Sequence, residues 1–333
     1  MHAMEWSVTT APSRLAGPVP LQQHPRYAAA CTALGRSVLW LRLGPQDAPL
    51  AHALILSRHW PGLGRAALVS RGPVWSPELT PAARSGALHA LVRGLRRTHA
   101  AVIATPDRVH GVDPLDQCGL LDLVTPMTVA QLELSGDAAA QRARLHGKWR
   151  NRLVRAEAAD VCVDITQMPP DPDHWLLREE AAQARTRRYR RLPPAFAAAW
   201  AAQGPGAAAL LVAHQRRVPV AGMLFLRHGN AASYHVGWTG RRGRTLCAHN
   251  LLMWRAMDYL AETGTTRLDL DLIDTQTAPS LARFKLGTGA VAVTLGTTRI
   301  SAPGTALVAR IAARLPPPAP EPAARAGGGP VTR

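Results

Sequence analysis

The sequence predicts an α/β protein of two similar units, each a mixed, mostly antiparallel sheet flanked by helices. Three observations lead to this fold. One order of elements occurs twice, a basic amphipathic segment separates the two occurrences, and 333 residues suffice for two domains with separate cores. We expect a first unit over 1–136, a second over 137–303, and a basic helix with a disordered Pro/Ala/Gly-rich tail over 304–333.

In the first unit, apolar runs predict three antiparallel strands, a helix, and a strand parallel to the third. The strands are expected at 38–43, 52–56 and 66–70, the helix at about 79–99 and the last strand at 101–104.

The second unit repeats this order, with Gly264 ending its helix as glycine often does. Its strands are expected at 209–214, 218–226 and 231–236, followed by a loop at 237–245, a helix at about 246–263 and a strand at 266–272.

Residues 137–160 contain no proline and one interior glycine, which favours a single helix opening the second unit. One face of that helix is apolar and carries Leu145, Trp149, Leu153 and Ala156. A neighbouring face carries Arg144, Lys148, Asn151 and Arg155. A polar stripe of this kind either binds an anionic ligand or is only a solvated face.

The net charge of +17 is unevenly placed. Residues 1–136 hold 12 Lys/Arg against 8 Asp/Glu, whereas residues 137–333 hold 27 against 14. This asymmetry predicts a polyanionic partner or substrate met by the second unit, the alternative being a basic surface that is only solvated. Lysine occurs only at Lys148 and Lys285, so these two positions stand out in a chain that otherwise uses arginine.

The four cysteines, Cys31, Cys118, Cys162 and Cys247, are scattered without a C-x-x-C pair. This spacing argues against a zinc site or a disulfide framework, so we expect no metal and a cytoplasmic protein. No signal peptide is recognisable at the N-terminus, and no apolar run is long enough to span a bilayer.

Four short motifs in order resemble the FemAB family of tandem GNAT-fold acyltransferases. The segment KWRNRLVRAEAADV from Lys148 is similar to the family's helix pattern K-x-x-R-N-x-[IV]-R-x-A-x-x-x-G-V, although Asp160 stands in place of the glycine. GTTRLD at 264–269 and FKLG at 284–287 resemble the family's late strand and turn, the second being one residue shorter. RGPV from Arg71 resembles a segment of the first unit, so the resemblance spans about residues 30–300.

The resemblance implies amide formation, classically from an aminoacyl-tRNA onto the amine of a peptidoglycan precursor, without a tightly bound cofactor. Two alternatives stay open. An acyl-CoA donor would make the protein an N-acetyltransferase of a small molecule or peptide. A non-catalytic RNA- or anion-binding module would retain only the fold.

The candidate catalytic residues are Lys285, His235, Asp269 and Asp271. Lysine offers a compact cation for an oxyanion or an anionic substrate group. Histidine near its ordinary pKa relays protons, and the paired carboxylates, expected on one side of their strand, suggest a general base. Helix termination, packing and loop hydrogen bonds are the structural alternatives for these residues.

The candidate binding residues are basic, amide or phenolic. For substrates we expect Lys148, Arg150, Asn151, Arg155, Arg71, Tyr234 and Asn250, and for the phosphates of the donor Arg241, Arg242 and Arg244. A second basic segment, 185–191, could touch RNA or form a solvated helix end.

Overall fold

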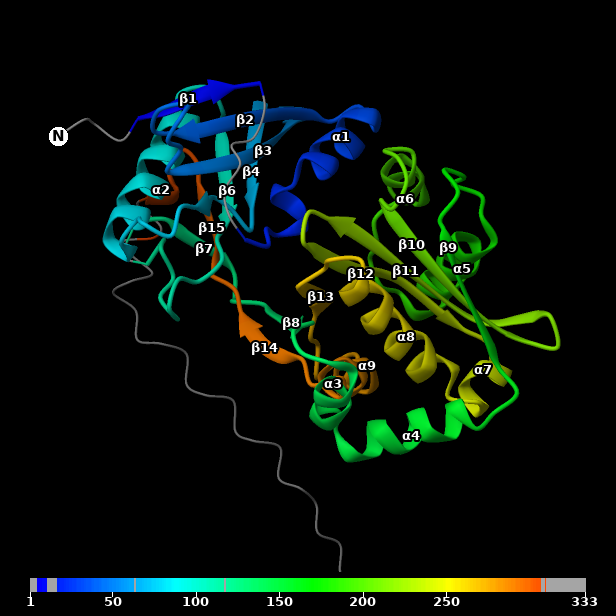
Figure 1. The fold of residues 1–333 in the computed structure, drawn as a ribbon. Helices are drawn as coiled ribbons and strands as arrows, with labels where there is room; N and C mark the ends of the chain where they lie inside the picture. The colour runs from blue at the N-terminus through cyan, green and yellow to red at the C-terminus, as the bar shows by residue number, and fades with distance from the viewer. Residues whose placement is uncertain (1–4, 11–16, 63, 117, 307–308, 310–333) are drawn as a thin grey trace, which may run out of the picture.

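The computed structural model describes residues 5–10, 17–62, 64–116, 118–306 and 309, and it consists of two sheets covered by helices (Figure 1). The first sheet has the order β1-β2-β3-β4-β6-β15-β7, with β5 paired to β3. Its strands are β1 (Trp6–Thr9), β2 (Ser37–Leu43), β3 (Ala51–Trp60), β4 (Gly64–Ser70), β5 (Val74–Trp75), β6 (Ala101–Thr105), β7 (Leu121–Val124) and β15 (Thr298–Ser301).

The second sheet has the order β14-β8-β13-β12-β11-β10-β9. Its strands are β8 (Thr128–Glu133), β9 (Cys162–Gln167), β10 (Ala208–Gln215), β11 (Val218–His228), β12 (Ala231–Thr239), β13 (Arg267–Leu272) and β14 (Val291–Thr294). The helical elements of the chain are η1 (Leu21–Gln23), α1 (Pro25–Ala33), α2 (Pro81–Leu95), α3 (Ala138–Arg144), α4 (Gly147–Glu157), α5 (Trp175–Arg187), α6 (Pro194–Ala201), α7 (Arg241–Thr245), α8 (Ala248–Glu262) and α9 (Pro279–Leu286).

The predicted repeat of element order is confirmed. Strands β2, β3 and β4 are antiparallel, α2 follows, and β6 pairs parallel to β4. Strands β10, β11 and β12 are likewise antiparallel, α8 follows, and β13 pairs parallel to β12. Because a parallel pair needs a crossover connection, each long helix supplies that crossover and covers one face of its sheet.

Each sheet contains at least one strand from the other side of the predicted domain boundary at 136/137. The boundary itself stays a prediction. Strand β8 precedes that division yet pairs with β13 and β14, and β15 returns to pair with β6 and β7. Arg299 holds β15 in place by donating to the carboxylates of Asp113, Asp116 and Asp122 at 2.7, 2.7 and 2.8 Å. Most of the predicted tail at 304–333 lies outside the described residues.

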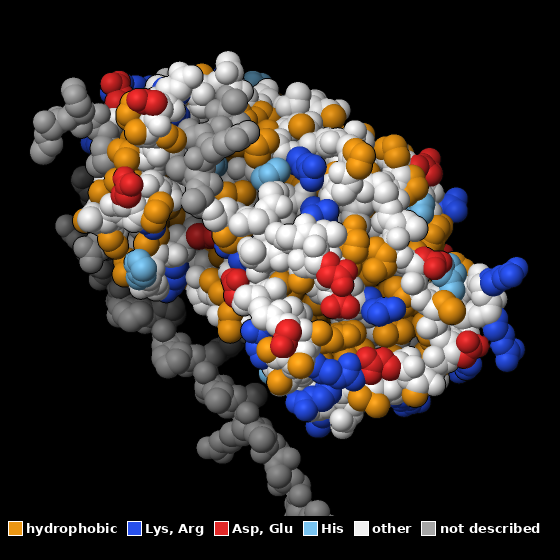
Figure 2. All heavy atoms as spheres, viewed as in Figure 1, with side chains coloured by type: hydrophobic (Ala, Val, Ile, Leu, Met, Phe, Trp, Pro, Cys, Tyr) orange, Lys and Arg blue, Asp and Glu red, His pale blue; other side chains and the backbone are white. Residues whose placement is uncertain are grey.

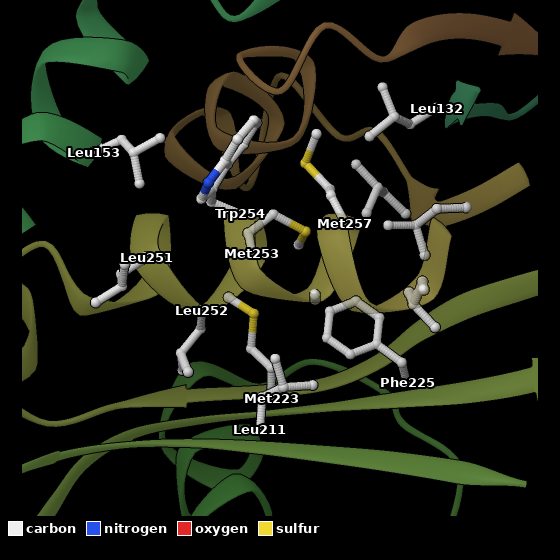
Figure 3. Close-up of a cluster of buried hydrophobic side chains, with 14 of the residues drawn as sticks. Leu132, Leu153, Leu211, Met223, Phe225, Leu251, Leu252, Met253, Trp254 and Met257 are labelled. Atoms are coloured by element: carbon white, nitrogen blue, oxygen red, sulfur yellow. The ribbon is translucent and has the colours of Figure 1, made fainter. Parts of the chain in front are cut away.

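The largest core lies between α8 and the second sheet (Figure 3). Leu252 from α8 points toward Leu211 and Met223 of the strands, Met257 points to the other side of α8, and all four are nearly or fully buried. Burying each such side chain contributes about 2 kcal/mol to folding. Helices α5 and α6 cover the opposite face of the sheet, where a second core forms.

The expectation of one continuous helix over 137–160 is wrong. Leu145 and His146 have extended backbone, with ψ of 134° and 142°, and separate α3 from α4. The His146 amide donates to Gly287 O at 3.0 Å, so a tertiary contact at the end of α9 breaks the helical pattern. The predicted apolar face survives the break, because its four residues are all buried.

The expected loop at 237–245 is also wrong. Strand β12 extends to Thr239, and residues 241–245 form α7. Gly243 makes this compact turn feasible, because a Cβ there would overlap with Val220 O. In the described part of the chain, no helix has the length and apolar character needed to cross a membrane.

Candidate functional site

Strands β12 and β13 diverge after three paired positions. Their register runs from Ala231–Arg267 to Ser233–Asp269, after which β12 continues to Thr239 beside β11 without pairing with β13. A bulge opposite Leu224 and Phe225 redirects β12, and a second irregularity between Asp269 and Leu272 redirects β13. We call the diverging segments, 234–239 and 270–272, the strand fork.

The equivalent strands of the first unit stay together. Strands β4 and β6 pair from Ala66–Ala101 to Ser70–Thr105, and the Arg71 amide adds a bond to Thr105 O at 2.7 Å. Backbone groups that a fork leaves unpaired can bind an extended ligand, whereas a closed pair has none to offer. The strand fork therefore places the candidate site in the second unit.

Arg71 joins the two units at the base of the fork. Its guanidinium bonds Asp107 at 2.9 and 3.1 Å and reaches Asp269 of β13 at 2.5 Å. Burial alone would lower the pKa of Arg71, but the two carboxylates raise it above its usual range. These bonds connect the two units, and a substrate-binding role for Arg71 stays a prediction.

Asp269 and Asp271 differ in burial, and their expected role as a paired general base stays a prediction. Asp269 is buried and accepts from Arg71 and from the Asp271 amide, the latter at 2.8 Å. Asp271 has a left-handed φ of 66° and an exposed side chain. The turn at this position breaks the alternation of a regular strand, which the sequence pattern alone had suggested.

Lys285 lies inside the fork rather than on the surface. It is 4% exposed, and its Nζ donates to Leu272 O at 2.7 Å. Burial lowers the pKa of Lys285, whereas Asp271 and Asp269 act to raise it. The bulge in β13 frees the carbonyl that Lys285 binds, so the ammonium group holds the end of β13 and keeps two further N–H donors.

Tyr234 and His235 occupy the bulge of β12. The Tyr234 phenol lies over Gly237, where a Cβ would overlap with its hydroxyl oxygen, so the glycine makes room for it. Burial raises the pKa of Tyr234, and the nearby Tyr189, Glu180 and Asp271 add to the effect. Burial lowers the pKa of His235 to about 4, which makes it a weak base at neutral pH.

The predicted donor arginines lie on α7, beside the end of β12. Arg242 donates to Gln215 at 2.6 Å and Arg244 to Thr239 O at 3.0 Å, while Arg241 is exposed. His249, which sequence reasoning missed, donates from Nε2 to Trp238 O at 2.8 Å, and its ring lies 6.0 Å from that of Phe284 at a tilt of 45°. The available signal was its place near the start of the helix expected at about 246.

Helix α4 presents the other predicted binding residues. Lys148, Arg150, Asn151 and Arg155 are exposed, and Arg150 also donates to Leu145 O at 3.1 Å. Figure 2 shows basic side chains gathered on the surface in the region of α4. Trp149 connects α4 to the fork, because its indole donates to Phe284 O at 3.1 Å. Phe284 lies on α9, the helix that also carries Lys285.

Two predicted binding candidates remain, Asn250 and the segment 185–191. Asn250 is 5% exposed, and its Nδ2 has no hydrogen-bond partner among the described residues. After α5 the chain turns back, so that Tyr189 donates to Glu180 at 3.1 Å and Arg191 pairs with it at 3.2 Å. Sequence reasoning considered the arginines and the aromatic residue of this segment and missed the Glu180 carboxylate that they contact.

Comparison with known proteins agrees with this geometry. Residues 139–285 match the family described as acetyltransferase (GNAT) domain. No curated protein matches the chain. Among solved structures, the crystal structure of FemX is similar with a TM-score of 0.66 and 12% identity, covering 84% of this chain and 92% of that one.

Two further structures have the same fold. The C-terminal domain of a putative lysylphosphatidylglycerol synthetase from Agrobacterium fabrum gives a TM-score of 0.54 at 13% identity, covering 88% and 91% of the two chains. A tandem GNAT protein from the clavulanic acid biosynthesis pathway gives 0.51 at 12% identity, covering 87% and 90%. At these identities the likeness concerns the fold.

The chain thus has a GNAT-type fold, and its second unit contains the residues that match the acetyltransferase (GNAT) domain. The fold of its two units together is similar to that of FemX, in agreement with the motifs that resemble the FemAB family.

Proposed function

We propose that the protein transfers an acyl or aminoacyl group to a primary amine at the strand fork. The observation that carries this proposal is the fork itself, where Lys285, Asp271 and Tyr234 converge. The GNAT domain at 139–285 includes all three residues. The FemAB resemblance supports a cell-envelope amine, such as that of a peptidoglycan precursor, as the acceptor.

The reaction forms a C–N bond and breaks the C–O or C–S bond of the donor. The acceptor ammonium loses two protons overall, one to a base and one to the departing hydroxyl or thiol. A tetrahedral intermediate carries negative charge on the former carbonyl oxygen, which Lys285 can stabilise with a free N–H donor. His235 and Asp271 stay candidates for proton transfer, although burial makes His235 a weak base by lowering its pKa to about 4.

Both donor classes suit the basic surroundings of the fork. The exposed cations of α4 and α7 provide contacts for the phosphates of a tRNA end or of CoA. Neither donor is a tightly bound cofactor, since each is consumed in turnover. We further propose a cytoplasmic setting, because a reducing compartment suits the four free cysteines.

Labelled aminoacyl-tRNA and labelled acyl-CoA, offered in parallel with a set of amines, test the proposal. RNase treatment should abolish transfer from the first donor only. Lys285→Ala should lower kcat at least 100-fold with the fold intact, and Lys285→Arg should restore little, because a planar guanidinium cannot fit the same space. Consumption of neither donor would leave a non-catalytic anion-binding module as the better description.

A further inference from the structure

Glu180 is a buried carboxylate beside the strand fork. It lies on α5, is 6% exposed, and is close enough to Tyr234 to raise the pKa of that phenol. Gln183, one turn further along α5, donates to Gly237 O at 3.4 Å and to the Tyr189 hydroxyl at 3.1 Å. Since Tyr189 donates in turn to Glu180, a hydrogen-bonded path connects this carboxylate to β12.

The carboxylate of Glu180 is incompletely neutralised. Each oxygen has one partner, Tyr189 on Oε1 and Arg191 on Oε2, which leaves lone pairs unused. The Arg191 contact of 3.2 Å is longer than the 2.7–2.9 Å of a strong charge-assisted bond, and the arginine side chain is 26% exposed. Asp269 differs, because both of its oxygens accept from buried or backbone donors.

Several cations lie around the strand fork, which also contains Asp271. Arg191 acts on His235, and Arg187 and Arg244 act on His249, so three guanidinium groups flank the fork together with Lys285. A cationic amine would be repelled by these groups unless a carboxylate received it. The Tyr234 hydroxyl, which lies against Gly237, adds an acceptor.

We propose that Glu180, assisted by Tyr189, binds the ammonium group of the acceptor amine and takes one of its protons. This inference rests on the proposed N-acyltransferase function and specifies its acceptor site. The ammonium donates to Glu180, an N–H bond breaks, the proton remains on the carboxyl group, and the neutral amine attacks the donor carbonyl. Burial raises the pKa of Glu180, which brings it closer to the range of a useful base.

Binding of a defined probe tests the site without turnover. Nα-acetyl-L-lysinamide carries one primary amine, and its Nα,Nε-diacetyl counterpart carries none. Isothermal titration should show that wild type and Glu179→Gln, an exposed neighbour on the same helix, bind the first probe and not the second. Glu180→Gln keeps the shape and the Tyr189 bond, and its affinity for the first probe should fall at least tenfold.

The variant Arg191→Gln distinguishes two roles for Glu180, amine binding and a structural ion pair with Arg191. Removing the competing cation should tighten amine binding, whereas a structural pair would give the same loss in both variants. Equal affinity of wild type and Glu180→Gln, or no binding by wild type, would overturn the inference. If amine binding depends on Glu180 but the protein transfers no acyl group, the result contradicts the proposed function and not the amine site.

Discussion

The guanidinium of Arg71 lies 2.5 Å from the carboxylate of Asp269, although 198 positions separate them in the chain. Arg71 follows β4 of the first unit, and Asp269 lies on β13 where the strand fork of the second unit begins. Both side chains are nearly buried, at 8% and 10% exposed. The first unit therefore fixes the base of the fork in the second.

Arg71→Ala should lower the free energy of unfolding by about 3–5 kcal/mol, because it leaves Asp269 buried without its counter-charge. Denaturant unfolding measures this change. Arg142→Ala is the matched control, since the Arg142–Glu157 pair is about one-third exposed on both sides and should cost less than 1 kcal/mol. Similar losses in both variants would show that the Arg71–Asp269 pair is not the main connection.

Acid should destabilise the protein through His24, which lies at the contact between the units with its ring 5.8 Å from that of His228. Burial lowers the pKa of His24 from 6.5 to about 4. Between these values the unfolded chain binds more protons, so stability is complete above about pH 6.5 and falls as pH drops towards 4. The loss from His24 should be about 2 kcal/mol after allowance for its partly exposed ring.

Unfolding at pH 7.5, 6 and 5 measures this loss. His24→Asn is the suitable variant, because the His24 ring caps α1 by accepting from the Arg26 amide at 3.2 Å and asparagine also caps helices well. The variant should show a shallower dependence on pH. If the variant shows the same dependence of unfolding free energy on pH, other buried histidines cause the acid sensitivity.

The sequence pattern predicted the repeat of elements because each helix and strand has local apolar periodicity. It could not predict the fork. The bulge opposite Phe225 and the left-handed Asp271 depend on which strands are neighbours, and that information is not local. For the same reason Lys285 was identified by composition and motif, while its burial against Leu272 O was not foreseen.

Tertiary contacts also decided which charged residues are accessible. Arg71 and Arg241 look alike in sequence, yet one is committed to two carboxylates and the other is exposed. Glu180 escaped notice because the arginines of segment 185–191 dominate its neighbourhood in the sequence. Only the turn of the chain after α5 brings Arg191 back onto Glu180.

The cations of α4 should affect ligand binding more than stability. Lys148→Ala and Arg155→Ala remove exposed side chains and should change the free energy of unfolding by less than about 0.5 kcal/mol. If α4 contacts tRNA phosphates, each variant should weaken tRNA binding and lower the magnitude of the salt slope by about 1. Arg93→Ala, on α2 of the first unit, is the control, and an equal effect there would indicate non-specific binding.

Gly237→Ala should disable the fork while sparing the fold. A Cβ at Gly237 would overlap with the Tyr234 hydroxyl, so the phenol must leave its place near Glu180 and Asp271. Because a displacement of about 1 Å in an active site can cost up to 100-fold in rate, we expect kcat/KM to fall at least tenfold. Gly86→Ala is the control, since Gly86 lies in α2 with open space around it and alanine should stabilise that helix by up to about 1 kcal/mol. Full activity of Gly237→Ala would mean that the position of Tyr234 does not matter to the reaction.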